Sequence, residues 1–285
     1  MNEVRRILSE GDLTLVGHIP SASNATLVCD VELDGSSLRC VYKPVRGEAP
    51  LWDFPDGTLA GREVAAAMID DALGWGLIPE TVLRDAGPPD ADLGPGMLQR
   101  WIHAEADPPP ADSEPPAEPE RPAEPAAEPV EVFPSDAVPD DYTPILRLSE
   151  DDGSVVVLAH STGDDVYRLA VLDVLLNNAD RKGGHMLVDA DGRLWGIDHG
   201  ISLHREPKLR TLLWGWAGEP VTEELREDLR RFADSLGPDD TLRAGLSALI
   251  SDAEIDALRR RATKLADGAP LPLPPAARAI PWPPF

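Results

Sequence analysis

The chain contains few cysteines, few aromatic residues and no long apolar run. Its only two cysteines are Cys29 and Cys40, too few for a disulfide framework or a metal cluster. They flank Asp34-Gly35-Ser36, a sequence typical of a hairpin turn, so we expect two reduced core residues. No stretch approaches the ~18 consecutive apolar residues of a membrane span, and the first residues lack the apolar run of a signal peptide. We therefore expect a cytoplasmic protein without a transmembrane segment.

Positive charge is also scarce. The 285 residues include 26 Lys and Arg against 51 Asp and Glu, which gives a formal net charge of -25. A surface of this sign repels nucleic-acid phosphates and anionic lipid, so a nucleic-acid partner is not expected. Any nucleotide would have to be bound by local features, such as a metal ion and one or two cations.

Acidic and proline residues concentrate in one segment. From Asp107 to Asp141 the chain has 11 Pro, 11 acidic residues and one basic residue, Arg121. Proline removes helical hydrogen bonds and like charges repel, so we expect a disordered linker over 107–141 that could recruit a protein partner. It would separate an N-terminal unit, 1–106, from a C-terminal unit, 142–268, which is followed by a Pro-rich tail, 269–285.

Hydrophobic periodicity predicts an α+β protein. Alternating residues predict strands in LTLVGHIP, ATLVCDVEL, LRCVYKPV, ETVLRD, GMLQRWI, MLVD and LWGID. Helical spacing predicts helices over 62–73, 165–176, 223–236 and 251–265. Ser251 and Glu254 form a capping box at the start of the last helix.

Two aspartates lie in the most informative stretch, Leu172 to Gly200. Asp180 sits in a loop after a predicted helix, and Asp198 follows the predicted hairpin. Phosphoryl transfer needs one carboxylate that orients and deprotonates the attacking hydroxyl and a second that holds Mg²⁺ on the nucleotide phosphates. Asp180 and Asp198 are our candidates for these two roles.

Two motifs around these residues resemble those of atypical kinases related to phosphatidylinositol 3- and 4-kinases, most closely the type II phosphatidylinositol 4-kinases. The motifs are Asn178-Ala179-Asp180-Arg181 and Ile197-Asp198-His199-Gly200. The resemblance implies a two-lobed, protein-kinase-like fold with a β-rich N-lobe, a mainly helical C-lobe, and ATP and Mg²⁺ as cofactors. It implies that Asp180 and Arg181 are the catalytic residues, with Asp180 as the base, and that Asp198 is the main metal ligand.

The resemblance continues upstream. Val41-Tyr42-Lys43-Pro44 is similar to the strand that carries the nucleotide lysine, which implies that Lys43 reaches the phosphates and that Glu63 is its ion-pair partner. Other expected nucleotide contacts are a phosphate loop without a glycine-rich pattern and an inter-lobe hinge. The residues concerned are Ser21, Ser23 and Asn24 in the loop, and Gln99, Arg100 and Trp101 in the hinge.

One residue departs from the family pattern. His185 replaces an Asn five residues after the catalytic Asp, so a second metal ligand would be an imidazole, which suits Mn²⁺ better than an amide does. The replacement leaves open a pseudokinase, a nucleotide-binding or scaffold protein without turnover. A third interpretation is a metal-dependent hydrolase that uses His185, Asp198 and His199, but it leaves Lys43 and Glu63 without a role.

The sequence thus predicts an ATP-dependent phosphotransferase that transfers the γ-phosphoryl group to a hydroxyl acceptor. The acceptor is unidentified. The acidic composition favours a protein or a small molecule over a lipid.

Overall fold

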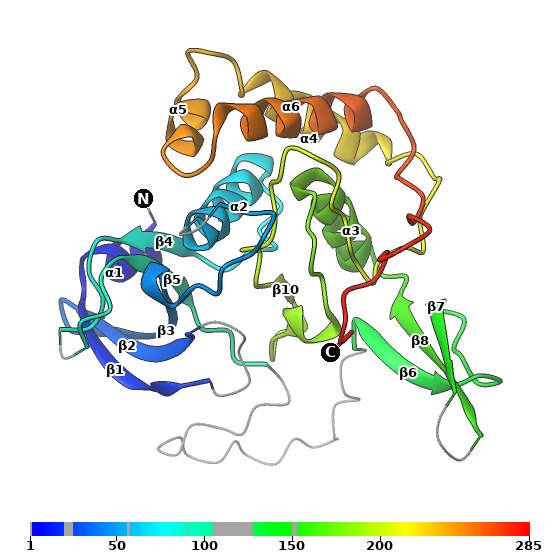
Figure 1. Ribbon diagram of the computed structural model, residues 1–285, viewed down its shortest axis with the longest axis horizontal. Helices are drawn as coiled ribbons and strands as arrows, with labels where there is room; N and C mark the ends of the chain where they lie inside the picture. The colour runs from blue at the N-terminus through cyan, green and yellow to red at the C-terminus, as the bar shows by residue number, and fades with distance from the viewer. Residues whose placement is uncertain (1, 20–24, 56–57, 90, 105–127, 150–152) are drawn as a thin grey trace.

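The computed structural model describes residues 2–19, 25–55, 58–89, 91–104, 128–149 and 153–285. These residues form a mixed α and β structure whose three sheets are antiparallel (Figure 1). The predicted α+β composition is therefore confirmed. None of the described helices is long and apolar enough to cross a membrane.

The N-terminal part is built on a five-stranded sheet with the order β1-β2-β3-β5-β4. Two helices pack on it, α1 (Glu3–Glu10), which the sequence analysis did not foresee, and α2 (Leu59–Leu73). The strands are β1 (Asp12–His18), β2 (Leu27–Leu33), β3 (Ser36–Pro44), β4 (Thr81–Arg84) and β5 (Gly96–Arg100).

The predicted hairpin turn and the state of the cysteines are confirmed. Asp34 and Gly35, which join β2 to β3, have φ of 53° and 83°, and this pair of left-handed residues matches a tight hairpin connection. Cys29 and Cys40 face each other in the register of these strands, and both are buried and free. Burial raises the pKa of the Cys29 thiol to about 11 and that of Cys40 to about 12, so both are protonated near neutral pH.

A three-stranded sheet begins within the segment that is predicted to be a linker, so the predicted end of the linker at residue 141 is wrong. It has the order β6-β8-β7, with β6 (Val130–Pro134), β7 (Tyr142–Ser149) and β8 (Val155–Ser161). β6 lies inside the segment 107–141 that we expected to be a disordered linker. Val130 is buried in the core and Phe133 packs beside Tyr142, so these apolar side chains fix the strand although acids and prolines dominate the segment as a whole. Residues 107–127 lie outside the described residues.

The C-terminal part is mainly helical. α3 (Asp164–Leu176) leads through a short 3₁₀ turn (Gly183–His185) into the hairpin of β9 (Met186–Val188) and β10 (Leu194–Gly196). Three helices follow, α4 (Glu223–Asp234), α5 (Thr241–Ser247) and α6 (Asp252–Ala266). The capping box of Ser251 and Glu254 is present at the start of α6, as predicted. Sequence periodicity did not indicate α5, β7 or β8.

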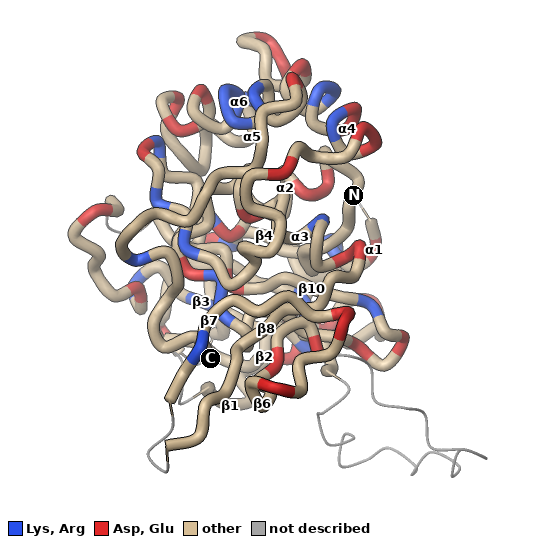
Figure 2. Tube along the Cα trace, turned by 90° about the vertical axis from the view of Figure 1, so that its right-hand side faces the viewer, with Lys and Arg blue, Asp and Glu red and all other residues tan. Residues whose placement is uncertain are grey.

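The largest hydrophobic cluster joins the two parts of the chain. It combines residues of α2, such as Ile69 and Leu73, with residues of α3, α4 and α6, such as Leu172, Leu229 and Leu258. Figure 1 shows α4, α5 and α6 lying across α2 and α3. Acidic and basic residues are interspersed along α4 and α6 (Figure 2). α2 is therefore packed between the N-terminal sheet and the C-terminal helices.

Candidate active site

Lys43 lies between two carboxylates from distant parts of the chain. Its Nζ is 2.8 Å from Glu63 Oε1 on α2 and 2.8 Å from Asp198 Oδ1, which follows β10. Strand β3 and helix α2 therefore present the lysine and the glutamate to the segment that carries Asp198. Glu63 is also fixed from its other side, because its Oε2 accepts the backbone N–H of His199 at 2.7 Å.

The electrostatics of this cluster favour the charged forms of Lys43 and Asp198. Burial by itself lowers the pKa of Lys43, but Glu63 and Asp198 together raise it above the ordinary lysine value. Burial likewise raises the pKa of Asp198, but Lys43 and then His185 reverse this effect and hold it well below the ordinary range. The side chain of Glu63 is 2% exposed whereas that of Asp198 is 44% exposed, so Asp198 is the carboxylate that solvent or a ligand can reach.

The backbone around Asp198 is shaped for this position. Asp198 has a φ of 60°, a left-handed conformation that is uncommon for a residue with a side chain and that persists where the surroundings enforce it. Gly200 lies beside α2, because a Cβ there would be in ordinary van der Waals contact, 3.5 Å from Leu59 and 3.6 Å from Glu63 Oε1. The turn that aims Asp198 at Lys43 is thus packed against α2.

His185 completes the cluster. Its Nε2 lies 3.2 Å from Asp198 Oδ2, and burial lowers the pKa of the imidazole below its ordinary value. A neutral imidazole nitrogen and a carboxylate oxygen at this separation fit two adjacent ligands of a divalent ion, which binds such atoms at ~2.1 Å. Within the described part of the chain, no group of three or more His, Cys, Asp or Glu residues could hold a metal. Two protein ligands suit Mg²⁺ or Mn²⁺, whose other positions phosphate oxygens and water fill.

Asp180 is accessible and lies on a loop tied to the same segment. Its side chain is 23% exposed, and its Oδ2 is 3.2 Å from Lys182 Nζ. The preceding residue, Ala179, donates its N–H to Ile201 O at 2.9 Å, just beyond the Asp198 motif. The loop that carries Asp180 is therefore held against the segment that carries Asp198.

Arg181 is buried and contacts several segments of the site. The sequence predicts a catalytic role for it, whereas these contacts are those of a positioning residue. Its side chain is fully buried and forms an ion pair with Asp173, with Nη2 3.0 Å from Oδ1. Nη1 donates to the carbonyls of His185 and Ile197 at 3.0 Å, and Nη2 lies 2.6 Å from His199 Nε2. One guanidinium thus contacts the backbone next to both members of the pair formed by His185 and Asp198.

Asp173 is the functional residue that sequence reasoning missed. Its Oδ2 also accepts the hydroxyl of Thr211 at 3.0 Å, and its Oδ1 accepts the Asn178 amide at 2.9 Å. The available signal was an aspartate on the apolar face of the helix over 165–176, since a carboxylate is rarely buried without a partner.

His199 is buried against Arg181, with Nε2 2.6 Å from the arginine Nη2, so this nitrogen is not free to bind a metal beside His185 and Asp198. Burial lowers the pKa of His199 well below its ordinary value, and the Arg181 guanidinium lowers it further. Its Nε2 accepts from Arg181, so the ring helps to position that arginine. This orientation does not favour a hydrolase site built on His185, Asp198 and His199.

The expected hinge side chains contact neighbouring protein groups. Gln99 is buried and donates to Thr81 Oγ1 at 2.9 Å, while Arg100 pairs with Glu80 at 2.6 Å and lies over the ring of Trp195. The backbone N–H of Trp101 donates to Arg39 O at 3.0 Å. The expected phosphate-loop residues, Ser21, Ser23 and Asn24, lie outside the described residues.

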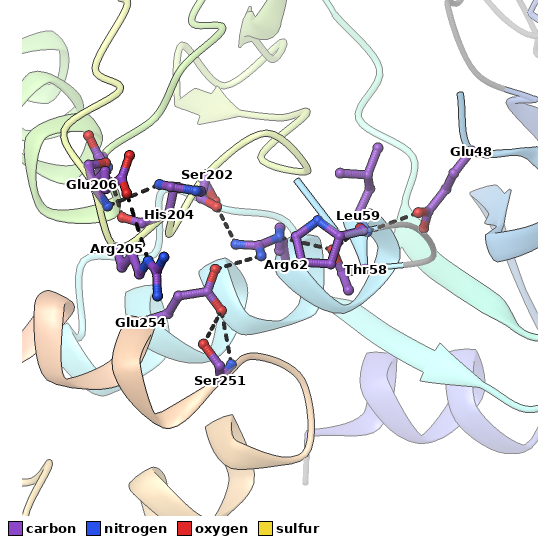
Figure 3. Close-up of polar contacts among 12 residues, drawn as sticks. Glu48, Thr58, Leu59, Arg62, Ser202, His204, Arg205, Glu206, Ser251 and Glu254 are labelled. Carbon is purple, nitrogen blue, oxygen red and sulfur yellow. Dashed lines mark hydrogen bonds and ion pairs between the residues drawn. The ribbon is translucent and has the colours of Figure 1, made fainter. Parts of the chain in front are cut away.

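Arg62 connects α2, the helix that carries Glu63, to the segment after Asp198 and to α6. In Figure 3 its guanidinium points between Ser202 and Glu254, donating to Ser202 O at 2.8 Å and to Glu254 Oε1 at 2.6 Å. Glu254 Oε2 in turn accepts from the backbone N–H and the hydroxyl of Ser251, at 2.9 and 2.7 Å. Arg62 is 1% exposed, so this bridge between α2, the segment after Asp198 and α6 is shielded from solvent.

A known protein is similar in sequence to this chain over nearly its whole length. No protein-family model matches the sequence. Protein Rv2133c of Mycobacterium tuberculosis is 48% identical over 279 residues, which cover 98% of this chain and 94% of that protein. The chain belongs to the Rv2133c family.

Two further similarities are more limited. Phosphatidylinositol 4-kinase gamma 3 of Arabidopsis thaliana is 36% identical over 84 residues, which are 27% of this chain and 14% of that protein. The crystal structure of a Helicobacter pylori proinflammatory kinase, CtkA, aligns with 92% of this chain and 94% of its own at 9% identity and a TM-score of 0.43. A TM-score below 0.5 does not establish a shared fold.

Proposed function

We propose that this member of the Rv2133c family is an ATP-dependent phosphotransferase that transfers the γ-phosphoryl group to a hydroxyl of a protein or a small molecule. The observation that carries the proposal is the position of Lys43 Nζ, 2.8 Å from both Glu63 and Asp198. A lysine held by a helix carboxylate beside a metal-binding aspartate is what kinases use to bind and orient nucleotide phosphates. The partial similarity to a phosphatidylinositol 4-kinase supports the same chemistry.

Each residue of the cluster has a role in this proposal. Lys43 binds the phosphates, and Glu63 keeps its ammonium in place. Asp198 and His185 would hold Mg²⁺ or Mn²⁺, and a bound ion would neutralise charge on the phosphates. Asp180, which is partly exposed, orients the acceptor hydroxyl and receives its proton, and Lys182 Nζ lies beside it, 3.2 Å from its Oδ2.

Titration calorimetry with ATP and a non-hydrolysable analogue, in Mg²⁺ or Mn²⁺, tests the nucleotide site. We expect metal-dependent binding to the wild type and at least a tenfold weaker affinity for Asp198→Ala. Asp191→Ala is a matched control, because Asp191 is an exposed aspartate in the turn between β9 and β10. Absence of binding to the wild type under both metals would exclude the enzyme.

A nucleotide-binding protein without turnover is the second candidate, and His185 favours it. A single-turnover assay with γ-labelled ATP separates the two. Label transfer or phosphate release that Asp180→Asn abolishes, at unchanged ATP affinity, supports the enzyme. Bound ATP recovered intact under either metal supports the second candidate.

A further inference from the structure

A cavity with mainly apolar walls lies next to the proposed nucleotide site. It has a volume of ≈ 230 Å³, and among the described residues that line it Glu128 has the only charged side chain. Its other walls come from the chain after β5, the start of β6, the segment 183–188 and the C-terminal tail. They include Ala104, Val130, Gly184, Met186, Val188 and Phe285.

The cavity lies beside His185, one of the two proposed metal ligands. Gly184 and Met186, which line it, flank His185, whose imidazole contacts Asp198. Ala104, which also lines the cavity, lies three residues beyond the expected hinge and forms a β-bridge with Asp189. A nucleotide with its phosphates at Lys43 and Asp198 can therefore extend its base towards this cavity.

The C-terminal tail reaches the cavity along a fixed path. After α6, Leu271 donates to Glu219 O at 2.8 Å, and the carbonyl of Ala279 accepts from Thr211 N at 3.2 Å and from Trp214 Nε1 at 3.0 Å. Figure 1 shows the tail, in red, descending from α6 to the neighbourhood of β6 and β10. At its end, Gly183 N–H donates to Pro284 O at 2.8 Å.

Phe285 packs directly on the loop that follows Asp180. A Cβ built on Gly183 would lie 2.3 Å from the Phe285 ring, so only glycine allows the ring to sit there. The ring is not enclosed, because Phe285 remains 56% exposed. One side of the ring is therefore supported by the catalytic loop, while the residue still lines open space.

We propose that Phe285 forms a wall of the nucleotide site and stacks on a planar heteroaromatic ring, such as a nucleobase, in this cavity. The inference rests on the proposed function and adds the tail to the site. Apolar cavities with one aromatic wall and nearby backbone groups suit flat, partly polar rings. Stacking a base on an aromatic side chain is worth ~1–3 kcal/mol by alanine substitution.

The test compares two ligands that share phosphates but differ in the base. Calorimetry with ATP and with inorganic tripolyphosphate, both with Mg²⁺ or Mn²⁺, is run on the wild type, Phe285→Ala and Phe285→Trp. We expect Phe285→Ala to weaken ATP binding roughly tenfold or more, to leave tripolyphosphate affinity unchanged, and to be rescued in Phe285→Trp. Trp282→Ala is the matched control, since Trp282 is on the same tail but is 77% exposed and does not line the cavity.

Gly183→Ala provides a second route to the same result, because the added methyl group displaces the ring. It should weaken ATP binding as Phe285→Ala does, with thermal unfolding confirming that both variants fold. Unchanged or tighter ATP binding by Phe285→Ala overturns the inference, as does an equal loss of ATP and tripolyphosphate affinity. If the wild type binds neither ligand, both the proposed function and the role of Phe285 are overturned. If the wild type binds ATP and Phe285→Ala binds it equally well, only the role of Phe285 is overturned.

Discussion

At the scale of single residues, the site depends on charges that are buried only because they have partners. The side chain of Glu63 is almost inaccessible to solvent, and its two oxygens pair with the Lys43 ammonium and with the backbone N–H of His199. Arg181 is fully buried and satisfied by Asp173 and by carbonyl groups. Removing one member of such a group leaves the others unpaired in a medium of low polarity.

Lys43→Met should therefore affect both binding and stability. It removes the proposed phosphate ligand and leaves Glu63 buried without its cation, so we expect ATP binding to be lost and the free energy of unfolding to fall by ~3–5 kcal/mol. Urea unfolding and calorimetry measure the two effects. Lys208→Met is the control, because Lys208 pairs with Asp53 outside the cluster; a similar loss of ATP binding in this control would contradict the role of Lys43.

Asp70 should make stability depend on pH. Burial raises the pKa of Asp70 to about 6 in the folded chain, while an unfolded aspartate titrates near ~3.9. The folded state therefore binds more protons between these values, so the contribution of Asp70 to stability is greatest below pH ~4 and is lost as the pH rises through about 6.

Asp70→Asn isolates this contribution. Between pH 4 and 7 the wild type should lose ~1–3 kcal/mol of unfolding free energy relative to the variant. Chemical denaturation at a series of pH values measures the difference. Parallel pH profiles for the two proteins would show that Asp70 titrates normally.

At the scale of elements, the position of α2 matters most, because it carries Glu63. Arg62 connects α2 to Ser202 and to Glu254 on α6, and it also lies over the ring of Phe54, 4.9 Å from its centroid. Arg62, next to Glu63 on α2, thus helps to hold Glu63 against the segment that follows Asp198.

Arg62→Met should loosen this connection. We expect a loss of ~3–5 kcal/mol in unfolding free energy, since Glu254 loses its buried partner, and weaker ATP binding, since Glu63 is less well placed. Arg243→Met is the matched control, because Arg243 also pairs with carboxylates of α6, Asp252 and Asp256, and ion pairs at the surface contribute little to stability. If Arg62→Met bound ATP as tightly as the wild type, the contacts of Arg62 would not be needed for nucleotide binding.

Periodicity predicted most elements because their apolar residues recur at regular spacing, as in α2, α3 and α4. It did not predict α1 and α5, which are short, or β6, whose apolar residues are embedded in an acidic, proline-rich stretch. Motif spacing selected Lys43, Glu63, His185 and Asp198, which the structure brings together. It could not distinguish the buried, positioning Arg181 from a catalytic one, because that depends on where the partner Asp173 lies.

At the scale of the whole molecule, we expect that the segment 107–127 can be shortened without moving the parts it connects. Ala104 and Glu128, on its two sides, line the same cavity, so a short linker can span them. We expect a Gly-Ser replacement of 107–127 to change the unfolding free energy by less than ~1 kcal/mol, because loop-closure entropy varies slowly with length. Denaturation and ATP titration measure this, and a large loss of either would show that the segment contributes contacts of its own.

The shared hydrophobic core has a consequence for how the protein can be divided. Since α2 buries Ile69 and Leu73 against α3, α4 and α6, the stretches 1–106 and 128–285 should recognise each other even without a peptide bond between them. Produced as two separate polypeptides in one cell, they should copurify and reconstitute the cluster of Lys43, Glu63 and Asp198. The family would then be suited to a split reporter, in which nucleotide binding appears only when the two fragments meet.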